Sequence, residues 1–289
     1  MNYRLHATRV IARRRIQELL LSPGYYVAAA LGLLLAYFLV GGFARSVDSS
    51  GFDFRLHPVY DLIGRSLEGA FGGTVVQKLF AEGPFQLVLY VAFLPVLLFL
   101  AASSVYRFGL ERKVGAVELL AYGPADGTSY FLAFLIKDLL GTLLYLAALA
   151  GFLAVTAALH NLVLGPTFFQ CLALLPFASV AVYAWGVFAS TLTDNSASAL
   201  AVFLALMVFF LVVFLGSFTI ASGYVASLST VFAWLVRWVS PLYYWDQALR
   251  FAEVASWLLY ALNLVLLLVV GAAVLAASHF ILRARGVRA

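Results

Sequence analysis

The chain has 289 residues, of which 64% are hydrophobic and only 11% are charged, and its mean hydropathy is +1.01. A soluble domain carries about 25% charged residues, so this composition excludes an ordinary globular protein and indicates an integral membrane protein. The net charge of +5 does not indicate nucleic-acid binding, because the basic residues gather where loops meet one membrane face. With Cys171 as its single cysteine, the chain forms no internal disulfide.

Residues 1–24 are predicted to form a cytoplasmic amphipathic helix. Arg9 and Arg13 are four residues apart and share one helical face, which Arg14 and Arg15 widen. An apolar side is supplied by Leu5, Ile16, Leu19 and Leu20. This pattern favours a helix lying on an anionic membrane surface, and a flexible basic tail is the alternative. Ser22-Pro23 is typical of the start of the next helix, with Ser at the cap and Pro at the first helical position.

Six apolar runs follow, each long enough to cross a hydrocarbon core of about 30 Å. The predicted spans are residues 25–43, 85–106, 130–159, 167–190, 197–221 and 256–282. We therefore expect an all-α fold with six transmembrane helices in a single domain, 1–289. Two long connections lie on the same side: a polar loop at 44–84 and a segment at 222–255 rich in Trp and Tyr. The second is expected to form an interfacial or re-entrant hairpin, or else an aromatic belt anchoring the last span.

Charge asymmetry predicts the orientation. Six spans place both termini on one side, where 12 Lys and Arg residues gather, against six on the other. The positive-inside rule puts both termini in the cytoplasm. The polar loop at 107–127 then faces the cytoplasm, and residues 44–84 lie outside.

This cytoplasmic loop has a helical pattern in its first half, where apolar residues recur at spacings of four, three and four. Glu111 and Glu118 are seven residues apart and lie on one flank of that helix, with Gly115 between them. Gly123-Pro124 ends it. The pattern predicts a short helix within 107–122, which is either an ordinary headgroup loop or a docking element for a soluble partner.

The order Glu111, Gly115, Glu118-Leu119-Leu120, Pro124 and then Lys137 resembles the first cytoplasmic loop of type-2 ABC transporter permeases. The resemblance implies that the loop carrying the first six of these residues forms a coupling helix, around Glu111 to Leu120, that docks on a cytoplasmic ABC ATPase subunit. It also implies an elbow helix before the first span, and a second permease subunit, most simply as a homodimer.

The outer segment carries a second resemblance. The run Ser240-Pro241-Leu242-Tyr243-Tyr244-Trp245-Asp246, followed by Arg250, is similar to a stretch before the last span in permeases of gliding-motility and nitrous-oxide-reductase maturation transporters. The chain departs from that pattern at Tyr244, Trp245, Asp246 and Phe251, where His, Phe, Glu and Gly are usual.

These resemblances imply a non-enzymatic permease subunit of an ABC exporter in a bacterial or archaeal plasma membrane, surrounded by membrane lipid. The chain has no Gly-x-x-x-x-Gly-Lys-Ser/Thr loop, so ATP and Mg would bind to the partner subunit, and no cofactor or metal is expected on this chain. The alternatives are a membrane-embedded enzyme, an ATP-independent secondary carrier, for which ionisable residues should cluster within the spans, and a membrane scaffold for an assembly machine.

Lys137 and Asp138 stand at the inner edge of the third span. They are interpreted either as a functional ion pair, or as a lysine that extends to the headgroups beside an aspartate packed on a neighbouring loop.

Overall fold

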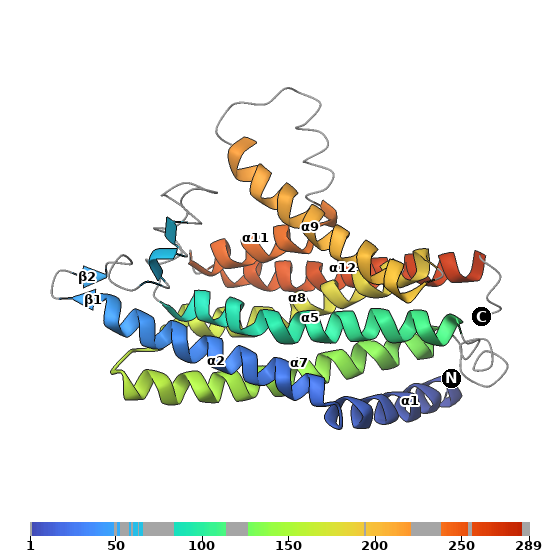
Figure 1. Ribbon diagram of the computed structural model, residues 1–289. Coiled ribbons are helices and arrows are strands. Elements are labelled where there is room, and N and C mark those ends of the chain that lie inside the picture. The colour runs from blue at the N-terminus through green and yellow to red at the C-terminus, as the bar shows by residue number, and fades with distance from the viewer. Residues whose placement is uncertain are drawn as a thin grey trace. The chain divides into compact units, whose positions relative to one another are not determined.

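The computed structural model describes residues 2–48, 51–52, 58, 60–62, 64–65, 84–113, 127–193, 195–220, 238–253 and 256–284. In these residues the elements are α1 (Asn2–Leu20), α2 (Pro23–Ser46), β1 (Val47–Asp48), β2 (Gly51–Phe52), α5 (Pro84–Lys113), α7 (Gly127–Leu159), α8 (Pro166–Leu192), α9 (Ser196–Ile220), α11 (Pro241–Glu253) and α12 (Trp257–Ala284), as Figure 1 shows.

Six of these helices, namely α2, α5, α7, α8, α9 and α12, are long and apolar enough to cross a membrane. The predicted six apolar helices are therefore confirmed, and the chain is a multi-pass membrane protein by helix length and composition. Apart from the two-residue strands β1 and β2, which pair antiparallel, the described elements are helical. The hairpin lies in the loop predicted at 44–84.

Helix boundaries follow local sequence signals. As expected from Ser22-Pro23, α2 begins at Pro23. Asn195 caps α9, because its Oδ1 accepts a hydrogen bond from the Ala197 backbone N–H at 3.1 Å. α7 ends in a turn with Asn161 at φ 55°, a left-handed conformation that Asn tolerates. The Leu162 N–H donates to the Ala157 carbonyl at 2.9 Å, as in a Schellman motif.

One predicted boundary is wrong. A separate short helix was expected to begin near Arg107, after a span ending at 106, but α5 continues without a break through Lys113. The physical reason is that no proline lies between Tyr106 and Lys113, and the single glycine, Gly109, is tolerated in a helix. Gly115, Glu118, Leu119, Leu120 and Pro124 lie outside the described residues.

The chain divides into two compact units. The first comprises Met1–Ser22, Leu98–Thr142 and Leu174–Ala289, and the second comprises Pro23–Leu97 and Leu143–Ala173. In the second unit, the Tyr145 hydroxyl donates to the Ala92 carbonyl at 2.7 Å and the Tyr145 ring stacks on Phe93. Gly32 of α2 lies against the same groups, so α2, α5 and α7 pack closely there.

Gly32 gives a first prediction. A Cβ at Gly32 would overlap the Tyr145 hydroxyl and the Ala92 carbonyl oxygen, whereas a Cβ at Gly41 or Gly151 would meet nothing within 4 Å. We expect Gly32→Ala to destabilise the protein by about 1–3 kcal/mol through overpacking. Gly41→Ala and Gly151→Ala are matched controls and should leave stability unchanged or slightly raised. Thermal unfolding in detergent measures all three, and equal midpoints would contradict the predicted packing.

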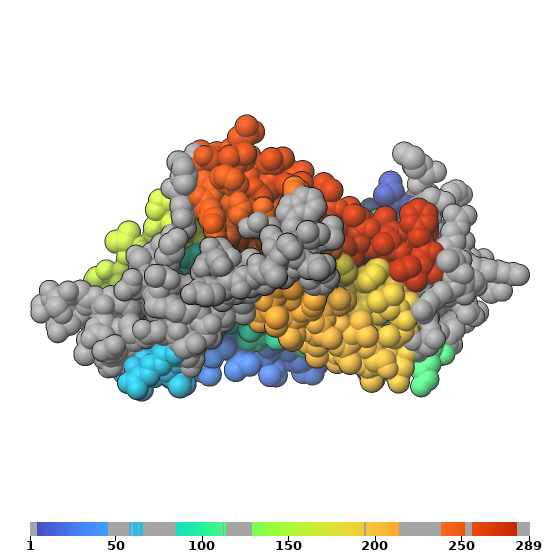
Figure 2. Space-filling view, turned by 90° about the horizontal axis from the view of Figure 1, so that it is seen from above, coloured from blue at the N-terminus to red at the C-terminus, as the bar shows by residue number. Residues whose placement is uncertain are grey.

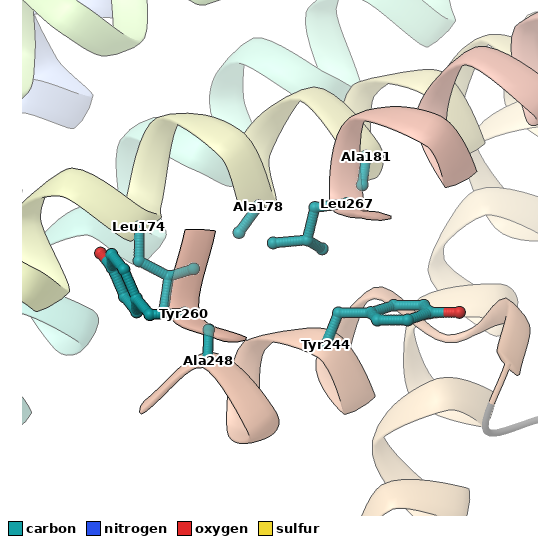
Figure 3. Close-up of a cluster of buried hydrophobic side chains, with 7 residues drawn as sticks. All are labelled: Leu174, Ala178, Ala181, Tyr244, Ala248, Tyr260 and Leu267. Atoms are coloured by element: carbon teal, nitrogen blue, oxygen red, sulfur yellow. The ribbon is translucent and has the colours of Figure 1, made fainter. Parts of the chain in front are cut away.

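In the first unit, α11 packs on α8 and α12 through one apolar cluster (Figure 3). Its buried members are Leu174, Ala178 and Ala181 of α8, Tyr244 and Ala248 of α11, and Tyr260 and Leu267 of α12. Ala178 and Ala181 of α8 and Ala248 of α11 are small and leave room for the larger Tyr260 and Leu267 side chains of α12.

α9 and α12 form much of the visible surface of this unit (Figure 2). Only 17% of the apolar window of α9 and 28% of that of α12 is buried within the protein, against 67% for α8. Leu204, Val208 and Val212 of α9 are among the exposed side chains. Such faces suit a lipid environment, which agrees with a membrane location.

Candidate functional site

Arg15 is the centre of a charged network between three helices of the first unit. Its guanidinium forms an ion pair with Glu111 of α5, lies 3.0 Å from Glu18 Oε2 of its own helix, and donates to the Tyr130 hydroxyl of α7 at 3.3 Å. It also stands 4.8 Å from the centroid of the Phe134 ring, a cation–π contact. The Arg15 side chain is 12% exposed, so the exposed basic face expected for it is wrong.

Glu18 is the second centre of the network. Arg107 of α5 donates to Glu18 Oε2 at 2.6 Å, and Arg14 donates to Oε1 at 3.1 Å. Burial raises the pKa of the Glu18 carboxyl, but the charges of Arg15 and Arg107 and the hydrogen bonds from Arg15 and Arg14 outweigh burial and hold that pKa below its ordinary value. Glu18 is therefore a carboxylate at neutral pH, and it binds α1 to the end of α5.

The two carboxyl oxygens of Glu111 differ in their hydrogen bonds. Oε1 binds Arg15, whereas Oε2 is buried and has no hydrogen-bond partner in the part of the chain that the structure describes. Glu111 was predicted to face a partner protein, together with Glu118, from a separate helix. It belongs instead to the last turn of α5 and is bound within the chain, and its role in docking stays a prediction.

An aromatic cluster packs beside the Arg15 network. Phe108 of α5 and Tyr130, Phe131 and Phe134 of α7 are buried with Val187 of α8, and Ile11 of α1 packs against them. The Tyr130 and Phe134 rings are 5.0 Å apart between centroids. Because Tyr130 and Phe134 are four residues apart, α7 presents both rings to Arg15.

Lys137, Asp138 and Ser104 form a second, fully buried cluster. Lys137 Nζ lies 2.8 Å from Asp138 Oδ1, an ion pair that lacks the alignment of a hydrogen bond, and it donates to Ser104 Oγ at 2.8 Å. Ser104 Oγ in turn donates to Asp138 Oδ2 at 2.6 Å. The Lys137 and Asp138 side chains are 3% and 2% exposed, so the lysine does not extend to the headgroups. That expectation is wrong because Ser104 of α5 and its opposite-charge neighbour hold Lys137 inside the protein.

Helix length places this cluster with respect to a bilayer. α7 has 33 residues and is about 50 Å long, which exceeds a hydrocarbon core of about 30 Å. Residues 139–159 carry no charged side chain and are sufficient to cross that core. In α5, residues 85–106 also carry no charged side chain and are sufficient to cross the core. We therefore expect Ser104, Lys137 and Asp138 at the edge of the hydrocarbon core, and Arg15 and Glu111 beyond it.

The outer segment places its predicted residues around the start of α11. The helix begins at Pro241 as expected, and the Tyr243 N–H donates to the Ser240 carbonyl at 3.2 Å. Asp246 and Arg250 form an ion pair at 2.8 Å across one helical turn. Whether the segment is re-entrant stays a prediction, since residues 221–237 lie outside the described residues.

At two positions where the chain departs from the permease motif, Tyr244 and Trp245, the side chain packs in or against the apolar cluster. Tyr244 is buried in the cluster of Figure 3, and its hydroxyl donates to the Trp238 carbonyl at 2.8 Å. Trp245 packs against the same cluster.

Comparison of the chain with protein-family models, curated proteins and solved structures finds no match. Among the residues that the structure describes, no three His, Cys, Asp or Glu side chains gather as a metal site would require. The site is therefore defined by its own contacts: a polar network at the ends of α5 and α7, and a buried ion pair one to two turns further along them.

Proposed function

We propose that the chain is the permease subunit of an ATP-driven exporter, working as a dimer with two cytoplasmic ATPase subunits. The observation that supports this proposal is the Arg15 network. It ties α1 to Arg107 and Glu111 at the end of α5 and to Tyr130 and Phe134 at the start of α7. These are the two helices that residues 114–126 connect, so a displacement of that segment would move three helices together.

In this proposal, ATP binding closes the two ATPase subunits and displaces residues 114–126. α5 ends at Lys113, directly before that segment in the chain, and Arg15 links α5 to α1 and α7, so the displacement would pass to all three helices. The spans carry few charges, which favours an amphipathic or lipid-like cargo over an ion. The chain itself hydrolyses nothing.

The second candidate is an ATP-independent secondary carrier or a membrane-embedded enzyme. The buried Lys137–Asp138 pair with Ser104 favours it, because ionisable groups inside a span often mark ion or proton pathways. A carrier of this kind would depend on an ion gradient and would need no ATPase.

The deciding experiment uses Glu118→Lys and Gly115→Trp, made in the full chain and co-expressed with the cognate ATPase that this proposal requires. Charge reversal should weaken docking by about 2–5 kcal/mol if Glu118 is buried in the contact. Tryptophan at Gly115 should block it sterically. Co-purified ATPase and the rate of its stimulated hydrolysis are the readouts, and Arg65→Gln, in a loop predicted to lie on the opposite side, is the control.

The expected result is loss of complex and of stimulated hydrolysis for both variants, with normal yield of the chain. Full complex and full hydrolysis in both would reject the ATPase-driven exporter. Substrate movement that persists without the ATPase and collapses with the proton gradient would establish the carrier instead.

A further inference from the structure

The two faces of α1 have different surroundings. On the inward face, Arg15 and Leu19 are largely buried, and a Cβ at Gly141 of α7 would come within 2.8 Å of Leu19. Glu18 binds Arg107 of α5. These contacts hold the second half of α1 along the ends of α5 and α7, so the opposite face of α1 turns outward.

The outward face is basic in its middle and apolar at its end. Arg9 and Arg13 are exposed, and the Arg14 side chain is 81% exposed. We refer to these three residues as the α1 basic face. Leu20 and Leu21, which follow it, are also exposed, Leu21 at 83%.

The charge of the α1 basic face is not compensated within α1. Glu18 is the sole acidic residue of this helix, and it already binds Arg14, Arg15 and Arg107. Arg9 and Arg13 are one helical turn apart, so both present their guanidinium groups to the same side. Planar guanidinium groups spaced in this way suit phosphate, which accepts two hydrogen bonds from each.

Chain connectivity puts this face beside the membrane. α1 ends at Leu20 and the first spanning helix begins at Pro23, so Leu20 and Leu21 lie at the entry of the chain into the apolar region. Arg13 is seven residues before Leu20, about 10 Å along the helix. The headgroup layer is about 5–7 Å thick on each side, so an α1 inclined to the membrane normal brings Arg13 to headgroup level when Leu20 lies at the hydrocarbon edge.

We propose that the α1 basic face binds the phosphate groups of anionic membrane lipids, with Arg9 and Arg13 as the principal ligands. Leu20 and Leu21 contact the acyl chains of the same leaflet. The occupant is a bilayer surface and not a protein, because exposed arginines and exposed leucines follow one another in the order of headgroup and hydrocarbon. The proposal does not depend on ATP-driven transport or on which leaflet faces α1.

The test uses the full chain in vesicles of phosphatidylcholine containing a minor fraction of phosphatidylglycerol. A fluorophore is attached at Val10→Cys, which lies between the arginines on the exposed face, while the native Cys171 is buried. Quenching by headgroup-labelled phosphatidylglycerol is compared with quenching by headgroup-labelled phosphatidylcholine. The ratio reports which lipid lies next to the α1 basic face.

The parent should prefer the anionic lipid, and R9Q/R13Q should lower this preference by about fivefold for each arginine removed. The matched control is R45Q/R65Q, which removes two exposed arginines from the loop and helix end at the other side of α2 and should leave the ratio unchanged. Added salt should lower the ratio of the parent, which tests the proposal even if a variant purifies poorly.

A parent ratio equal for the two lipids, or R9Q/R13Q equal to the parent, would overturn the proposal. If R9Q/R13Q keeps the lipid ratio of the parent but no longer binds the ATPase, the proposal is overturned and the arginines are assigned to a protein partner.

Discussion

Replacing one member of the buried Lys137–Asp138 pair is expected to cost about 3–5 kcal/mol, because the other charge is then left buried without its partner. Lys137→Met leaves the Asp138 carboxylate with the Ser104 hydroxyl as its donor. Asp138→Asn leaves the Lys137 ammonium facing neutral groups. The double variant K137M/D138N removes both charges, and it should be more stable than either single variant. Thermal unfolding in detergent measures the three midpoints.

The same variants separate a structural from a functional ion pair. If the pair only joins α5 and α7, the double variant should recover transport together with stability. If the pair carries protons or contacts cargo, the double variant should be stable yet inactive. Ser104→Ala is the companion measurement, since it removes the hydroxyl that contacts both charges and should cost about 1–3 kcal/mol. If the stability loss of K137M/D138N equals the sum of the losses of the two single variants, the two charges do not interact.

The second large effect is expected at Arg15. Arg15→Gln removes the ion pairs to Glu18 and Glu111 and the cation–π contact with Phe134. We expect a loss of about 2–3 kcal/mol, since the network is mostly but not fully buried. Arg15→Lys should restore little, because an ammonium cannot reproduce the planar fork of donors. Arg14→Gln is the control: its pair with Glu18 is solvent-exposed and should be worth less than about 1 kcal/mol.

The stability loss caused by Arg15→Gln is expected to depend on pH. The network holds the pKa of Glu18 below its ordinary value, so the charged form stabilises the folded state at neutral pH. That contribution should fall as the pH drops below the ordinary value of 4.5 and disappear below the lowered pKa. The stability difference between the parent and Arg15→Gln should therefore shrink in acid. A difference that is constant with pH would show that Glu18 does not depend on Arg15.

The spans could be predicted because their signal is local. An uninterrupted apolar run reports its own length, and Ser22-Pro23 and Asn195 act on the helix that directly follows each. The end of α5 could not be placed in the same way, since a change from apolar to polar composition at Arg107 is a change of environment and not a break in the helix.

The contacts of the site could not be predicted because they are long-range. Arg15 looks like one member of a basic cluster, and its partners Glu111 and Tyr130 are 96 and 115 residues away. The sequence offered one hint, the lone acid Glu18 three residues after Arg15. Lys137 was expected to reach the headgroups because its neighbour Ser104, 33 residues earlier, cannot be recognised as a partner from spacing.

The separation of Arg15 from Tyr130 has a consequence for synthesis of the chain. Ribosomes add about 5–20 residues per second, so the 115 residues from Arg15 to Tyr130 take roughly 6 to 23 seconds to appear. During that time α1 is complete but the start of α7, against which it will pack, does not yet exist. α1 is thus translated well before the helix that completes its contacts, and a ribosome that stalls between residues 20 and 130 would leave an assembly intermediate in which Arg15 lacks its contact with Tyr130.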